Sequence, residues 1–331
     1  MDAGSQRKRI VILGGGTGLS TLLRGLKLFP LDLTAVVTVA DDGGSSGRLR
    51  NDLEIPPPGD IRNVIAALSD TEPLVAEMFQ YRFKNSVDLQ GHSLGNLMLA
   101  ALTDITGDFS HAVREMSRVL SVNGTVLPAA NQIVTLKAEF EDGTIVSGES
   151  KIPAYLQPIK RVFLEPRDVK TLPDTITAIR RADFIIIGPG SLYTSIMPNL
   201  LVKDIKKEVI ESKAKKLYIC NLMTQAGETY KYTASDHVKA LYDHVGCEFL
   251  DAILLDKVQV PSVVAERYKK EKASPVECDE AHLRSIGLEI HRQDITNIFD
   301  ETVRHDPMKV AKWLFEYTGG VKNKDSKPMY F

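Results

Sequence analysis

Cysteine is scarce in this chain of 331 residues, where it occurs only at Cys220, Cys247 and Cys278. This wide spacing fits neither a disulfide framework nor a zinc motif, and it favours a reducing cytoplasm over secretion. Long apolar runs are missing as well, since none reaches the roughly 18 residues of a membrane span. The start of the chain, MDAGSQRKR, lacks the apolar core of a signal peptide. We therefore expect a cytoplasmic protein without a membrane span.

A surplus of positive charge is also missing. Lys and Arg number 41 against 43 for Asp and Glu, which gives a formal net charge of −2. A protein that binds a nucleic-acid backbone needs basic residues to neutralise its phosphates. The composition therefore predicts that neither DNA nor RNA is a partner, whereas the 43% of apolar residues suffice for a large core.

Short apolar runs alternate with helical patterns along most of the chain. The runs predict strands that are buried on both faces, at residues 10–13, 33–40, 184–187, 217–220 and 252–255. Apolar residues recur at helical spacing over 19–29, 60–68, 94–103, 109–120, 202–211, 235–243 and 306–317. This alternation predicts the α/β class, with a mainly parallel sheet covered by helices on both faces.

Two segments depart from this alternation. Residues 122–165 contain a period-two pattern around Asp142 and Gly143, which predicts an antiparallel hairpin insertion beside the main sheet. The charged stretch 257–285 predicts a C-terminal helical cap, which we place at about 257–305. We expect a single α/β domain over residues 1–320, followed by a polar tail at 321–331.

Two glycine-rich loops directly follow predicted strands, at the edge where parallel sheets bind ligands. Gly14–Gly18 (GGGTG) leads into a helix, and such a junction offers free backbone amides to a phosphate. Its spacing lacks the third glycine of the dinucleotide fingerprint, and no Lys–Ser/Thr pair follows as in a Walker A loop. Gly188–Ser191 (GPGS) predicts a second phosphate cradle.

Three further loops are polar. Residues 41–50 (DDGGSSGRLR) suit an anion nest with arginines, and Asp41 or Asp42 suits a ribose hydroxyl or a divalent cation. In residues 56–63 (PPPGDIRN), Asp60 fits equally well as a helix N-cap and as a ligand-binding residue. Residues 91–96 (GHSLGN) match the GxSxG elbow of serine hydrolases, but no buried strand precedes them. We therefore interpret them as a helix start that offers Ser93 and Asn96 to a ligand.

The remaining candidates lie in the C-terminal half. Tyr268 suits stacking on a base and Arg304 suits pairing with a diphosphate, although each equally fits an ordinary helix surface. The candidate ligand-binding residues are Gly15, Gly16, Thr17, Gly18, Asp41, Asp42, Gly44, Ser45, Ser46, Arg48, Asp60, Arg62, Asn63, His92, Ser93, Asn96, Gly188, Gly190, Ser191, Asn221, Thr224, Tyr268 and Arg304.

Taken in order, several motifs resemble those of the CofD-like superfamily, and most closely its YvcK branch, the gluconeogenesis factors. These motifs are GGGTG, TVADDGGSSGRLR, PPPGDIRNVIAAL, GHSLGNLMLAAL, GPGSLYTSIMPNLLV and CNLMTQAGET. The resemblance extends over about residues 9–318, and it implies a three-layer αβα, Rossmann-like core whose motif loops bind a nucleoside diphosphate. Another branch contains 2-phospho-L-lactate transferases, and Asp42 and Asp60 stand where that branch places metal-binding aspartates.

The YvcK branch implies a cytoplasmic regulator that binds a UDP-sugar such as UDP-N-acetylglucosamine and is needed for cell shape and wall synthesis during gluconeogenic growth. It also raises the expectation of a homo-oligomer and of partners in wall synthesis. Two enzyme hypotheses stay open: a Mg²⁺-dependent transferase of the 2-phospho-L-lactate type, and an NAD-binding enzyme that uses Asp41. The residues favour a ligand-binding protein over an enzyme. They include no well-defined nucleophile, no pair of carboxylates for acid–base catalysis and no metal cluster.

Overall fold

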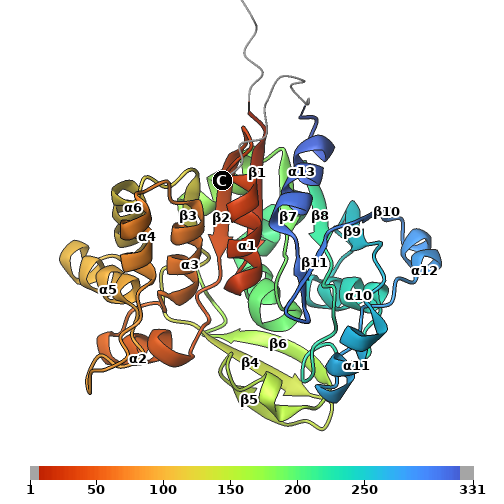
Figure 1. Ribbon diagram of the computed structural model, residues 1–331, viewed down its shortest axis with the longest axis horizontal. Helices are drawn as coiled ribbons and strands as arrows, with labels where there is room; N and C mark the ends of the chain where they lie inside the picture. Colours follow the sequence, from red (N-terminus) through yellow and green to blue (C-terminus); the bar gives the residue numbers. More distant parts are fainter. Residues whose placement is uncertain (1–6, 321–331) are drawn as a thin grey trace, which may run out of the picture.

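A computed structural model describes residues 7–320 (Figure 1). Seven strands form the central sheet in the order β10-β9-β8-β7-β1-β2-β3, and neighbouring strands run parallel throughout. Their bounds are β1 Arg9–Gly14, β2 Asp32–Val37, β3 Thr125–Pro128, β7 Phe184–Ile187, β8 Lys215–Ile219, β9 Ala252–Asp256 and β10 Glu289–Gln293. The predicted α/β class with a mainly parallel, Rossmann-like sheet is confirmed.

Helices connect the strands and cover the sheet. They are α1 Gly16–Leu26, α2 Gly44–Leu53, α3 Gly59–Leu68, α4 Pro73–Gln80, α5 Leu94–Thr106, α6 Phe109–Val119, α7 Pro173–Arg181, α8 Met197–Leu201, α9 Lys203–Glu211, α10 Ala234–Val245, α11 Ser262–Lys270, α12 Glu280–Ser285 and α13 Pro307–Tyr317. Helix α1 lies between α3 and α13 (Figure 1). Helices α7 and α8 pack on β1 in a second group with α9. Within residues 7–320 we find no helix with the length and apolarity that crossing a membrane requires.

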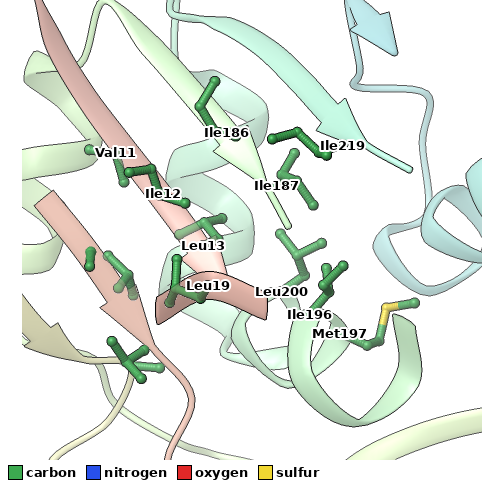
Figure 2. Close-up of a cluster of buried hydrophobic side chains, with 14 of the residues drawn as sticks. Val11, Ile12, Leu13, Leu19, Ile186, Ile187, Ile196, Met197, Leu200 and Ile219 are labelled. Carbon is green, nitrogen blue, oxygen red and sulfur yellow. The ribbon is translucent and has the colours of Figure 1, made fainter. Parts of the chain in front are cut away.

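The hydrophobic core lies directly beneath the loops that carry the motifs. Ile12 and Leu13 at the end of β1 are fully buried, as is Ile187 at the end of β7. Figure 2 shows these side chains packed with Leu19 of α1 and with Ile196 from a π-helical turn, Leu192–Ile196. Because the strand ends are fixed in the core, the loops that follow them start from rigid positions.

The segment predicted as a hairpin insertion, 122–165, is divided between two sheets. Its first part is β3, which pairs in parallel with β2 and so completes the main sheet. The rest contains a 3₁₀ turn, Pro153–Tyr155, and three antiparallel strands in the order β5-β4-β6: β4 Thr135–Phe140, β5 Ile145–Ser147 and β6 Ile159–Glu165. The prediction was wrong for β3, because a short apolar strand at a sheet edge has no period that distinguishes parallel from antiparallel pairing.

The predicted helical cap at 257–305 is only partly helical. It contains α11 and α12, but β10 is the edge strand of the main sheet, and β11 Thr296–Phe299 forms a hairpin with β12 Thr302–His305. This hairpin lies beside α1 and leads straight into α13. The cap therefore brings its last strand next to the first glycine loop. The predicted polar tail at 321–331 lies outside the described residues.

Candidate functional site

A cavity of about 410 Å³ lies at the carboxyl ends of β1, β7 and β8. We call it the rim cavity. Ten of its lining residues are among the sequence candidates: Gly15, Gly16, Thr17, Gly18, Gly190, Ser191, Asn221, Thr224, Tyr268 and Arg304. These positions come from five separate parts of the chain, and the fold brings them together where open parallel sheets bind ligands.

The first glycine loop presents the amino end of α1 to the rim cavity. Gly16 has a φ of +62°, a left-handed conformation that favours glycine. A Cβ atom at Gly18 would lie 2.9 Å from the carbonyl oxygen of Pro189, so only glycine allows the two loops to approach this closely. Helix α1 has no acidic residue in its first turn and no side-chain cap. The turn itself supplies no anion; the Asp60 carboxylate accepts from the amide of Gly16 at its start, and the amides that follow face the cavity.

The second glycine loop packs against the first and also lines the rim cavity. Gly188 and Gly190 have φ values of +84° and +156°, which place both in conformations that side chains rarely adopt. Asn221 holds this turn: its Nδ2 donates to the carbonyl of Gly190 at 2.9 Å, and its Oδ1 accepts from the Tyr218 hydroxyl at 3.2 Å. Asn221 therefore shapes the wall of the cavity through its hydrogen bonds to the protein.

Strand β12 and helix α11 contribute further lining residues to the rim cavity. Arg304 is exposed and lines the cavity, so its guanidinium is free to reach an anion at the edge. Tyr268 is held in place, because its hydroxyl accepts a hydrogen bond from the amide of Val303 at 2.9 Å. Burial lowers the pKa of His305 to about 4, and its Nε2 lies 3.1 Å from the carbonyl oxygen of Cys220. His305 is therefore neutral at pH 7 and donates to that carbonyl.

Asp60 joins the rim cavity to a second group of predicted residues. Its Oδ2 accepts a hydrogen bond from the amide of Gly16 at 2.7 Å. The N-cap of α3 is Pro58, so Asp60 bonds across to the first loop instead of capping its own helix. Burial raises the pKa of Asp60 to about 6, and the hydrogen bond from Gly16 opposes that rise.

The residues of loop 41–50 gather with those of loop 91–96 around the start of α2. The Ser45 hydroxyl lies 3.0 Å from Nδ1 of His92 and accepts from Nδ2 of Asn96 at 3.0 Å. Ser93 caps α5 by accepting from the amide of Asn96, and Arg48 donates to the carbonyl of Gln90. Ser45, His92 and Asn96 form a buried network in which the GxSxG serine acts as a helix cap, whereas Arg48 is exposed. None of these residues lines the rim cavity.

Arg62 and Asn63 do not line the rim cavity. The Arg62 guanidinium is buried, and it donates to Oε1 of Gln80 at 2.6 Å and to Oδ1 of Asn63 at 2.7 Å. Burial, followed by the neighbouring Arg82, lowers the pKa of Arg62 to about 10, which still leaves it charged at pH 7. Their predicted contact with a ligand stays a prediction.

The two aspartates that the resemblance assigns to a metal bond to different parts of the chain. Oδ1 of Asp42 accepts from the amide of Ser150 in the β4–β6 insertion, whereas Asp60 bonds to Gly16. In the part of the chain described here, no group of three or more His, Cys, Asp or Glu side chains is arranged to hold a metal ion. Asp42 and Asp60 do not form a three-ligand site, so the metal role stays a prediction.

Two acidic residues near the site were missed in the sequence. Burial, followed by the nearby Asp41 and Asp60, raises the pKa of the half-buried Glu149 to about 8. Glu228 is buried and accepts from the amide of Tyr193 at 3.1 Å and from the Thr194 hydroxyl at 3.0 Å. The motif CNLMTQAGET contains Glu228 and could have indicated it, but no local pattern marks Glu149.

Comparison with known proteins identifies the family. Residues 10–296 match the family described as 2-phospho-L-lactate transferase CofD. The chain is 62% identical to the "Gluconeogenesis factor" of Bacillus subtilis (strain 168), with 94% of this chain and 98% of that protein aligned. It is 46% identical to the "Gluconeogenesis factor" of Listeria monocytogenes, over 93% of this chain and 95% of the relative.

A solved structure agrees with the fold described above. The crystal structure of protein BH3568 from Bacillus halodurans matches with a TM-score of 0.91 and 55% sequence identity, over 94% of this chain and all of that one. The order of the glycine loops, the parallel sheet and the length of the match together show that this chain belongs to the CofD family, with gluconeogenesis factors among its similar relatives.

Proposed function

We propose that this protein is a gluconeogenesis factor that binds a UDP-sugar, such as UDP-N-acetylglucosamine, in the rim cavity. In this role it would regulate wall synthesis and cell shape during gluconeogenic growth in the cytoplasm. The names of the relatives support the first part of this statement. The observation that supports a UDP-sugar as the ligand is the position of the amino end of α1, which lines the cavity beside two glycine turns.

The charges around the rim cavity support a diphosphate as the central group of the ligand. The first amides of a helix lack intrahelical partners and carry a partial positive charge, so they favour phosphate oxygens. Arg304 adds a full positive charge at the mouth, and guanidinium–phosphate pairs are among the stronger hydrogen-bonded contacts. Tyr268 supplies an aromatic surface on which uracil can stack.

The test places a negative charge at the amino end of α1. Thr17 is exposed, lies in the first turn and lines the rim cavity. In Thr17→Asp, the new carboxylate stabilises α1 by about 0.3–1 kcal/mol, but it repels the diphosphate. We expect isothermal titration calorimetry to give an affinity for UDP-N-acetylglucosamine that is lower by about tenfold or more. The thermal midpoint should stay the same or rise.

The control is Thr17→Asn, which has nearly the same size without the charge and should bind much like the wild type. No binding of UDP-sugar to the wild type, or equal binding to Thr17→Asp, would count against the proposal. Displacement of the UDP-sugar by NAD at lower concentration would favour the dinucleotide hypothesis. The transferase hypothesis would be favoured by Mg²⁺-dependent turnover of a nucleoside-diphosphate donor, if that turnover disappeared in Asp42→Ala. The contact of Asp60 with Gly16 is the observation that supports this alternative.

A further inference from the structure

A second cavity adjoins the rim cavity along the same edge of the sheet. It has a volume of about 330 Å³ and shares Asn221 and Leu222 with the rim cavity. We call it the side cavity. It lies at the carboxyl ends of β8 and β9, where Asp256 ends β9 and Lys257 follows it. A ligand bound at α1 can therefore extend past Asn221 into the side cavity without leaving the edge of the sheet.

The lining of the side cavity combines apolar walls with a few polar groups at the edge. Leu222, Val258 and Val276 supply apolar surface, while Gln259 and Arg292 supply hydrogen-bonding groups. This is the ordinary make-up of a small-molecule site. A sugar ring fits this chemistry, because its C–H faces pack on apolar side chains and its hydroxyls accept hydrogen bonds from amides and guanidinium groups.

Asp256 lines the side cavity and is held in place by hydrogen bonds to the protein. Its carboxylate accepts from the amide of Ile295 at 3.1 Å and from the Thr296 hydroxyl at 2.6 Å, which ties β9 to the chain that follows β10. Arg292 is exposed and lies 3.3 Å from Glu280, a pairing at the protein surface that is worth little. The guanidinium of Arg292 can therefore turn toward a ligand at low cost.

We propose that the side cavity binds the sugar end of the nucleotide sugar, while the rim cavity binds its UDP part. This assignment rests on the proposed function and names the part of the ligand that each cavity takes. The aromatic surface suited to the base, Tyr268, lines the rim cavity, and so does the amino end of α1 suited to the diphosphate. The side cavity is the adjoining space, so it receives the group attached beyond the second phosphate.

The first test fills the side cavity. Val258 lines it and is 39% exposed, so Val258→Trp adds bulk at the surface without disturbing the core. The affinity for UDP-N-acetylglucosamine should fall about tenfold or more, whereas the affinity for UDP should stay within about twofold. The matched control is Val263→Trp, because Val263 is 73% exposed on α11 and outside both cavity linings. The control should bind both ligands like the wild type.

The second test uses the cysteines of the wild-type chain as probes. Cys278 lines the side cavity and is half-buried, whereas Cys247 is exposed and lines neither cavity. Burial raises the pKa of Cys278, so its alkylation by iodoacetamide is slowed by a smaller thiolate fraction. Saturating UDP-N-acetylglucosamine should slow alkylation of Cys278 further, while UDP alone should not. The rate at Cys247 should not change with either ligand.

Three outcomes would overturn the assignment. Equal loss of UDP and UDP-sugar affinity in Val258→Trp would place the base in the side cavity instead. No change in either affinity, with Cys278 unprotected, would leave the sugar outside the side cavity. Both of these results would leave the proposed function intact, because the wild type would still bind the nucleotide. A wild type that binds neither UDP nor the UDP-sugar would overturn the proposed function and the sugar assignment together.

Discussion

Asp60 of α3 holds the first glycine loop in place. Its carboxylate bonds to the amide of Gly16, and it also lies against Gly15, where a Cβ atom would come within 2.8 Å of Oδ2. A carboxylate in this buried position fixes the backbone of the loop before any ligand arrives. It also makes the loop sensitive to pH, because burial holds the pKa of Asp60 near 6, above its ordinary value of 3.8.

The change Asp60→Asn should remove this pH dependence. An acid whose pKa is raised on folding stabilises the folded chain at low pH, and this stabilisation is lost as the pH rises from 3.8 through about 6. Asparagine can still accept the hydrogen bond from Gly16. We expect the variant to gain stability relative to the wild type between these pH values, by up to about 3 kcal/mol. Urea unfolding at several pH values measures the difference.

The comparison variant for this experiment is Glu149→Gln. Burial raises the pKa of Glu149 to about 8, so its effect on the free energy of unfolding should continue to higher pH than that of Asp60. A stability difference between Asp60→Asn and the wild type that stays constant from pH 4 to 7 would show that Asp60 titrates at its ordinary value in the folded chain.

At the scale of elements, the contact between α1 and α13 depends on Gly25. A Cβ atom there would overlap the carbonyl oxygen of Pro307 and would lie 2.7 Å from its carbonyl carbon. Pro307 begins α13 only three positions after Arg304, so the helix contact also positions the mouth of the rim cavity. At an exposed helix position, alanine stabilises the helix by about 1 kcal/mol relative to glycine. At position 25 the backbone of Pro307 occupies the space that the alanine Cβ needs.

Gly25→Ala should therefore destabilise the protein by about 1–3 kcal/mol, because overpacking against a rigid backbone forces the two helices apart. It should also weaken UDP-sugar binding through the displaced Arg304. Thermal unfolding and calorimetry measure the two effects. The control Arg24→Ala changes an exposed neighbour on the same helix and should alter neither by much. A stable Gly25→Ala variant that binds normally would show that α13 adjusts without moving the hairpin.

The central strands and their loops were predictable from the sequence, because buried parallel strands are apolar runs and ligand loops follow them. Helix α2 was not, since its first turn, Gly44–Gly47, has poor intrinsic helix propensity. It forms because contacts from afar stabilise it, such as those of Ser45 with His92 and Asn96. Glu149 was missed for the same kind of reason, since only tertiary folding brings the insertion against loop 41–50.

At the scale of the whole molecule, one hydrophobic core joins both ends of the described chain. It includes Ile10 of β1 and Leu314 of α13, while Met223, Val264 and Val303 form a second, small cluster. The rim cavity also combines the two ends of the fold, because residues 15–18 and residues 303–305 line it. A ligand in the rim cavity therefore contacts the first and the last parts of the fold at once, and its binding energy should stabilise the molecule as one unit.

We therefore expect a single unfolding transition that shifts as a whole with ligand. At a concentration of UDP-sugar 100 times its dissociation constant, the free energy of unfolding should rise by about 2.7 kcal/mol. The single tryptophan, Trp313, reports on α13 by fluorescence, while circular dichroism reports on all helices. The two probes should give coincident urea transitions with and without ligand, as a two-state reaction requires. If only the fluorescence transition moved, α13 and the β11–β12 hairpin would unfold separately, and the cavity would depend on a C-terminal segment that opens on its own.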